Sequence, residues 1–116
     1  MKRARTFAAL AAFAAFSVLA ATPVAWAKGD AESGKSKAAQ ICAACHGPKG
    51  DKPSTPDQPI LAGQHYDYLV NALSDYKSGK RVNPIMKGFA STLTKKDIED
   101  LAAWFAGQSS ALRSER

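Results

Sequence analysis

Residues 42–46 read Cys-Ala-Ala-Cys-His, and this pentapeptide decides how the rest of the chain is interpreted. At the pitch of an α-helix, Cys42 and Cys45 lie on one face, so both sulfurs can bond to one edge of a planar ring. His46 follows directly, and its imidazole can reach a metal at the centre of that ring. Cys-x-x-Cys-His is the attachment sequence of a c-type haem. The pentapeptide therefore predicts one covalently bound haem, with His46 as a ligand of its iron.

Other interpretations of the two cysteines explain fewer residues. A thioredoxin-like Cys-x-x-Cys pair normally follows a strand in a βαβ unit, and the sequence has no strand pattern. A Cys2His2 zinc site needs a second pair of ligands, and His65 is the only other histidine. A disulfide between the two cysteines would leave His46 without a role. Haem attachment is therefore the preferred interpretation.

The second axial ligand of the iron can be sought among two side chains. Met86 is the only methionine besides Met1, and it lies in a Pro- and Gly-containing stretch that can fold across the opposite face of the haem. A lone methionine is also often core filler. His65 is the only free histidine, although a histidine in the first turn of a helix is usually solvated. Methionine raises the reduction potential and a second histidine lowers it, so the choice matters.

Three helical segments are predicted around the pentapeptide. The first begins near Asp30, a good N-cap, and runs into the cysteine motif. The second spans about residues 64–78, where apolar residues recur at helical spacing, and ends at Gly79. The third begins after Thr94, another good N-cap, and ends before Gly107.

Two long loops, residues 47–63 and 79–93, separate the three helices. The first contains four prolines and the second contains Pro84, so we expect turns and extended segments. Loops of this length in a small domain are usually functional or disordered. A cofactor lying against them would supply the missing packing. We therefore predict an all-α fold, with three main helices and long loops wrapped around one haem.

The first 27 residues have the order of features found in a secretory signal peptide. A basic start precedes the apolar, Ala-rich residues 7–21, and Ala-Trp-Ala at residues 25–27 is a cleavage signal. We expect cleavage after Ala27, which leaves a single domain, residues 28–116, in the periplasm. An uncleaved membrane anchor is the alternative. Cleavage lowers the net charge from +6 to +3, and nothing else favours nucleic-acid binding.

Beyond the pentapeptide, the sequence resembles the class I c-type cytochromes, and specifically the bacterial cytochrome c553 and cytochrome c4 group. The likeness spans nearly the whole chain after residue 28. Its most specific motif is Pro59-Ile60-Leu61-Ala62-Gly63-Gln64, which lies between the haem motif and Met86. Cytochrome c4 carries two haem motifs in tandem domains, whereas this chain has one. The resemblance is therefore to the single-domain c553 form or to half of a cytochrome c4.

The resemblance implies roles for individual residues. Met86 occupies the position of the family's axial methionine. The carbonyl of Pro59 is expected to accept a hydrogen bond from Nδ1 of His46, which orients the ring and increases its basicity. Leu61 is expected to face the haem. Gly34 is expected to let the first and last helices cross closely.

Basic side chains in and beside the two loops suggest contacts with anions. Arg81 is a candidate partner for a haem propionate. With this arginine, five lysines could steer acidic docking surfaces of redox partners. The five are Lys49, Lys52, Lys77, Lys80 and Lys87.

A haem iron held by both His46 and Met86 has no open coordination site, which argues against chemistry at the metal. We therefore predict a periplasmic monohaem c-type cytochrome that carries one electron at a time between redox proteins and is not an enzyme. It is expected to be monomeric and soluble after cleavage, with peripheral membrane association left open. The alternative is a haem subunit permanently bound to an exported dehydrogenase or oxidase. A haem sensor with an exchangeable sixth ligand is a third hypothesis.

Overall fold

The computed structural model describes residues 28–110, and the described part of the chain is entirely helical apart from turns and loops. The predicted all-α fold is confirmed. The predicted signal peptide, residues 1–27, lies outside the described residues. Within residues 28–110, no helix combines the length and apolar character needed to span a bilayer. The helices are α1 (Ala31–Ile41), α2 (Ala43–His46), α3 (Tyr66–Ser78), α4 (Pro84–Ala90) and α5 (Lys95–Ala106).

The starts of α1 and α5 are fixed by the predicted N-caps. The carboxylate of Asp30 accepts a hydrogen bond from the backbone N–H of Ser33 at 2.7 Å. Thr94 and Asp97 form a capping box, in which each side chain accepts a hydrogen bond from the other residue's backbone N–H. Because both caps satisfy donors that a helix cannot satisfy internally, these two helices begin where the sequence predicted.

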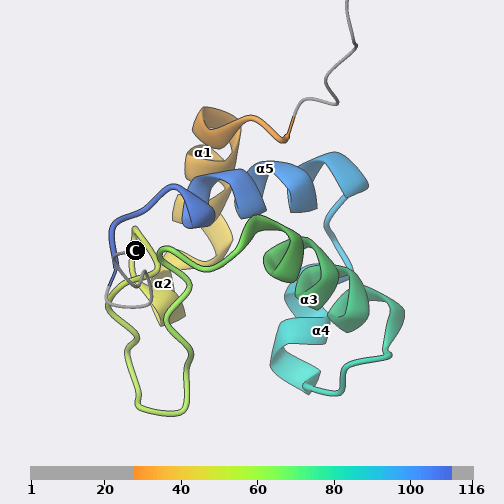
Figure 1. Cartoon of the computed structure of the whole chain (residues 1–116). Coiled ribbons are helices and arrows are strands. Elements are labelled where there is room, and N and C mark those ends of the chain that lie inside the picture. Colours follow the sequence, from red (N-terminus) through yellow and green to blue (C-terminus); the bar gives the residue numbers. More distant parts are fainter. Residues whose placement is uncertain (1–27, 111–116) are drawn as a thin grey trace, which may run out of the picture.

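Helices α1 and α5 cross closely at Gly34, as the resemblance implied (Figure 1). A Cβ atom on this glycine would lie 2.0 Å from the carbonyl oxygen of Asp100 and 3.0 Å from Cβ of Trp104. The carboxylate of Asp100 is buried and accepts hydrogen bonds from the backbone N–H of Asp30 and from the ammonium of Lys96. The crossing is therefore fixed by shape and by a buried, fully paired carboxylate.

The hydrophobic core lies mainly under α5. Leu101 is fully buried, and Ile98 and Phe105 from the same helix are 3% exposed. They pack with Ala38 of α1 and Leu69 of α3. The core is small, and several of its side chains also line a cavity.

Helix α3 begins at Tyr66, two residues later than expected, and ends at Gly79 as predicted. His65 is its N-cap residue rather than part of its first turn, and no side chain caps this end. Gly79 has φ of +85°, a left-handed conformation that favours glycine. The apolar spacing therefore predicted the body of the helix correctly and its first turn incorrectly.

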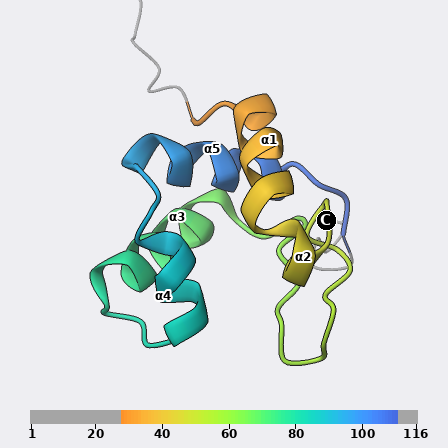
Figure 2. The ribbon, with the colours of Figure 1, turned by 180° about the vertical axis from the view of Figure 1, so that it is seen from behind.

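The prediction that residues 79–93 form only loop is wrong, because they contain α4. Asn83 caps this seven-residue helix, since its Oδ1 accepts hydrogen bonds from the backbone N–H groups of Ile85 and Met86, both at 3.0 Å. Pro84 occupies the first helical position, where it needs no hydrogen-bond partner. Figures 1 and 2 show α4 packed beside α3.

Residues 47–63 form the predicted irregular loop, and backbone hydrogen bonds attach it to the helices. The carbonyl of Gly50 accepts hydrogen bonds from the backbone N–H groups of Leu61 and Ala62, which closes the base of the loop. The N–H of Gly63 donates to the carbonyl of Phe105 at 2.9 Å. The base is thereby fixed against α5. Ser54, in the middle of the loop, donates hydrogen bonds to the carbonyls of Cys45 and Ala44 in α2, and the loop extends beyond this helix (Figure 1).

Candidate functional site

A cavity of about 430 Å³ lies between α2 and the 47–63 loop on one side and α3 and α4 on the other. We call it the central cavity. Its volume falls in the range of about 300–1,000 Å³ that is usual for small-molecule sites. Most of its walls are apolar side chains. They include Ile41, Ile60, Leu61, Leu69, Leu73, Ile85, Phe89, Leu93, Leu101 and Phe105.

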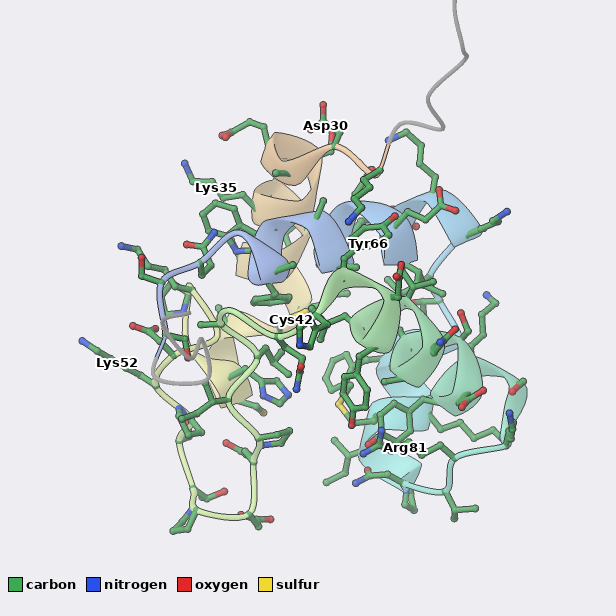
Figure 3. The ribbon with its side chains drawn as sticks, in the orientation of Figure 1. Asp30, Lys35, Cys42, Lys52, Tyr66 and Arg81 are labelled. Atoms are coloured by element: carbon green, nitrogen blue, oxygen red, sulfur yellow. The ribbon has the colours of Figure 1, made fainter. Side chains whose placement is uncertain are left out.

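The two cysteines line one wall of the central cavity. Helix α1 ends at Ile41, and Cys42 begins a second short turn, in which the N–H groups of Cys45 and His46 both donate to the carbonyl of Cys42. The chain therefore does not run as one unbroken helix into the motif. The helical turn nevertheless brings both thiols to the cavity, where Figure 3 labels Cys42.

The buried Cys42 thiol lacks the lowered pKa of a thiol that takes part in thiol–disulfide exchange. Neither Cys42 nor Cys45 forms a disulfide in the structure. Burial, with a smaller contribution from repulsion by Cys45, raises the pKa of the Cys42 thiol to about 11. Reactive Cys-x-x-Cys pairs instead have a lowered thiol pKa, because the thiolate is the nucleophile. The structure thus disfavours the thioredoxin-like alternative.

His46 lies in the same wall, is only 5% exposed, and is held by one hydrogen bond. Its Nδ1 lies 2.9 Å from the carbonyl oxygen of Pro59, so the contact implied by the resemblance is present. A carbonyl only accepts hydrogen bonds, and Nδ1 must therefore carry the ring proton. This tautomer leaves Nε2 with the lone pair that a metal ligand requires.

Of the two candidates for the second axial ligand, only Met86 reaches the central cavity. It is half-buried on α4 and lines the cavity together with His46. His65 is exposed at the start of α3 and does not line this cavity. The structure therefore brings Met86, and not His65, to the cavity that holds the cysteine motif. Ligation of iron by Met86 stays a prediction.

The other three predicted site residues, Pro59, Leu61 and Arg81, also line the cavity. Arg81 is exposed, and its Nη1 donates a hydrogen bond to the hydroxyl of Tyr68 at 3.2 Å. Its guanidinium carbon lies 4.9 Å from the centre of the Tyr76 ring. The Tyr68 contact raises the already high pKa of Arg81, and no carboxylate within residues 28–110 forms an ion pair with it.

Sequence reasoning missed part of the cavity wall on α3. Tyr68 and Ala72 line the cavity although neither was a candidate site residue. Leu73 and Tyr76 belong to the apolar stripe that predicted this helix. Apolar spacing shows which side of the helix is turned inward. It does not show whether that side packs in the core or lines a cavity.

Of the six basic side chains predicted to steer redox partners, only Arg81 lines the cavity. The ammonium of Lys77 donates hydrogen bonds to the carbonyls of Ser91 and Leu93. Lys80 pairs with Asp75 at 3.7 Å. Lys52 points away from the molecule on the 47–63 loop (Figure 3). Lys77 and Lys80 thus have partners within the protein, and steering of acidic redox partners by the basic side chains stays a prediction.

Comparison with known proteins places the chain in a family. Residues 29–105 match the family model described as cytochrome C oxidase, cbb3-type, subunit III. Cytochrome c4 of Pseudomonas aeruginosa is 46% identical over 90 residues, which cover 78% of this chain and 44% of that protein. Cytochrome c-554(548) of Halomonas halodenitrificans is 36% identical over 83 residues, which cover 69% of this chain and 98% of that protein.

The fold agrees with the sequence comparison. The crystal structure of reduced recombinant cytochrome c4 from Pseudomonas stutzeri superposes with a TM-score of 0.66 at 39% identity, covering 72% of this chain and 47% of that one. The chain thus spans about half the length of the cytochromes c4 that it matches. It belongs to the cbb3-type subunit III family of cytochromes, as a class I, cytochrome c4-like c-type cytochrome.

Proposed function

We propose that this protein carries single electrons between redox proteins on one covalently attached haem. Membership of the cytochrome c family itself implies electron transfer and a covalent haem c. The finer assignment is that Cys42 and Cys45 form the thioether bonds and that His46 and Met86 are the axial ligands. One observation carries this assignment. The two thiols and the imidazole line the central cavity from α2 and its N-cap residue Cys42, and the thioether lines it from α4.

The residues around the cavity fit a haem. The walls are largely apolar, the thiols are free, and hydrogen bonding to Pro59 leaves one imidazole nitrogen available. Three cavity-lining apolar side chains are unusually exposed, namely Ile85 at 68%, Phe89 at 43% and Ile60 at 37%. A large apolar ring lying between the walls would cover them, and their burial would stabilise the holoprotein.

The proposed ligands determine what kind of chemistry is available. When bound, haem supplies one-electron exchange between Fe(III) and Fe(II). His46 and Met86 would hold its iron, which would leave no coordination site for a substrate. The Met86 thioether would favour the ferrous state and raise the potential. With haem bound, the apolar walls would exclude water from the iron, and Arg81, which lines the cavity, would be available to pair with a propionate.

The proposed setting is the periplasm, after removal of residues 1–27, with residues 28–116 acting as one domain. A carrier that consists of this single domain is supported by the Halomonas cytochrome, because the match covers 98% of that protein. The description of the family model as an oxidase subunit favours a second possibility, a permanent subunit of an exported oxidase or dehydrogenase. Purification from native periplasm separates the two, since a free carrier migrates as a monomer and a subunit co-purifies with its enzyme.

A redox-titrated visible spectrum of the exported protein tests the assignment directly. We expect a c-type α-band from thioether attachment, a weak far-red band from methionine ligation in the ferric protein, and a single midpoint potential. Cys42→Ala and Cys45→Ala are expected to weaken attachment, with His65→Ala as the matched control that changes nothing. Rapid binding of CO by the ferrous wild-type protein near neutral pH would contradict six-coordinate ligation and favour the sensor hypothesis.

A further inference from the structure

We propose that Lys77 is a positioning residue that holds Met86 in the central cavity by tying the end of the Met86-bearing segment to α3. We call residues 79–93 the Met86 segment. The proposal rests on the proposed function, because Met86 is taken as an axial ligand.

The Met86 segment has little packing of its own. Within α4, Ala90 is the only buried residue, whereas Ile85 is 68% exposed and Phe89 is 43% exposed. A seven-residue helix is too short to be stable in isolation. Its position must therefore come from its contacts with α3 and from the places where the segment joins the body of the protein.

Polar contacts with the last turns of α3 fix both ends of the segment. At the beginning, the backbone N–H of Arg81 donates to the carbonyl of Asp75 at 3.0 Å. At the end, the Lys77 ammonium donates to two carbonyls, that of Ser91 at 3.3 Å and that of Leu93. Met86 lies between these two attachments.

The attachment by the exposed Lys77 has a charged donor, whereas the attachment at Arg81 joins two neutral backbone groups. A charged donor makes hydrogen bonds about twice as strong as those between neutral groups, and this one bridges two carbonyls that follow α4. Leu93 itself is 3% exposed and belongs to the core cluster. Lys77 therefore connects α3 to the residue at which the segment enters the core. Without it, the segment would open more often and withdraw Met86.

The test uses the haem-loaded protein with Lys77→Leu, which keeps an apolar stem but removes the ammonium. Imidazole serves as the probe, because it binds the ferric protein only when the sixth position is open. We expect Lys77→Leu to bind imidazole about tenfold more tightly and to exchange the amide hydrogens of residues 84–93 about tenfold faster, the effect of losing one charge-assisted hydrogen bond. Lys77→Arg, which retains a charged donor, is expected to recover most of both properties.

Lys80→Leu is the matched control, because the Lys80 side chain is 79% exposed and pairs only with Asp75 at the surface. It is expected to leave imidazole binding and exchange in residues 84–93 unchanged. Equal values for Lys77→Leu and the wild type would overturn the proposal. Uniformly faster exchange that extends through α1 and α5 would also overturn it, since it would indicate a general loss of stability. Should Lys77→Leu fail to fold, Lys77→Gln supplies the same comparison with a neutral donor.

A failure of the proposed function would look different. The wild-type ferric protein would then lack the methionine band, whatever the Lys77 variants do. The exchange measurement would still report whether Lys77 restrains the Met86 segment.

Discussion

The two short helices α2 and α4 carry the two proposed iron ligands, and they are held in different ways. His46 is 5% exposed on α2, which is separated from α1 by the single residue Cys42, and its ring is held by a hydrogen bond to Pro59. Met86 on α4 is half-buried in a helix with one buried residue, which is positioned by an N-cap and polar contacts to α3. His46 is held by the buried structure around it. The position of Met86 instead depends on a few contacts, each of which can be removed by a single substitution.

Removing the second ligand is expected to have the largest effect. Met86→Ala should abolish the far-red methionine band, permit rapid CO binding by the ferrous protein, and lower the midpoint potential by on the order of 0.1 V or more, because axial ligation spans about 0.8 V among haem proteins. Potentiometry with spectroscopy measures all three. His65→Ala is the control, since this histidine lies outside the cavity. An unchanged potential in Met86→Ala would exclude methionine ligation.

A glycine-to-alanine substitution should lower the free energy of unfolding in α1 but not in α4. Gly34→Ala gains about 1 kcal/mol of helix propensity, but its Cβ would overlap the backbone of Asp100 at 2.0 Å. We expect a net loss of about 3 kcal/mol in the free energy of unfolding. Gly88→Ala on α4 meets no atom within 4 Å and should be neutral or stabilising by up to about 1 kcal/mol. Chemical denaturation measures both, and similar losses would refute the comparison.

Loss of the N-cap should destabilise the whole fold at α5, whereas at α4 it should loosen mainly that helix. Thr94→Ala removes the capping box and should lower the free energy of unfolding by about 1 kcal/mol. Asn83→Ala removes a cap of similar strength, but its effect should appear mainly as tighter imidazole binding and faster amide exchange in α4. Equal decreases in the unfolding midpoint for the two variants would show that α4 is as well integrated as α5.

The smallest predicted effect concerns acid stability. Hydrogen bonds from Thr94, with a further contribution from Lys37, hold the pKa of Asp97 below its ordinary value of 3.8. A lowered carboxyl pKa stabilises the fold fully above pH of about 4, and this contribution is lost as the pH falls through the lower folded value. Asp97→Asn should therefore cost at most about 1 kcal/mol at pH 6 and less at pH 2. Unfolding curves at the two pH values measure this, and an equal loss at both would exclude a charge effect.

The sequence predicted most reliably those features that depend on local chemistry. Asp30 and Thr94 cap their helices as expected, Gly79 ends α3, and Gly34 allows the close crossing. The cysteine motif and Met86 were predicted to approach one site, and both line the central cavity.

The misses have physical reasons. Helix α4 was overlooked because seven residues are too few for apolar periodicity, although the Asn83-Pro84 pair is a start signal. The basic residues of the two loops were expected to face redox partners, but loop sequence does not show that Lys77 and Lys80 also find partners within the protein. Tyr68 lines the cavity because of the way α3 is rotated about its own axis. Only the packed structure fixes that rotation.

The position of Gly29 determines which side of the molecule a tether at the start of the domain would occupy. A Cβ atom on it would lie 2.2 Å from the backbone of Glu99, so the chain is seated against α5 almost from the first described residue. That point lies at the end of the molecule away from α2 and α4 in both Figures 1 and 2. A tether joined ahead of residue 28, such as a linker to an electrode, would therefore attach behind the redox centre. The side of the protein that holds the proposed haem would stay free to face solution.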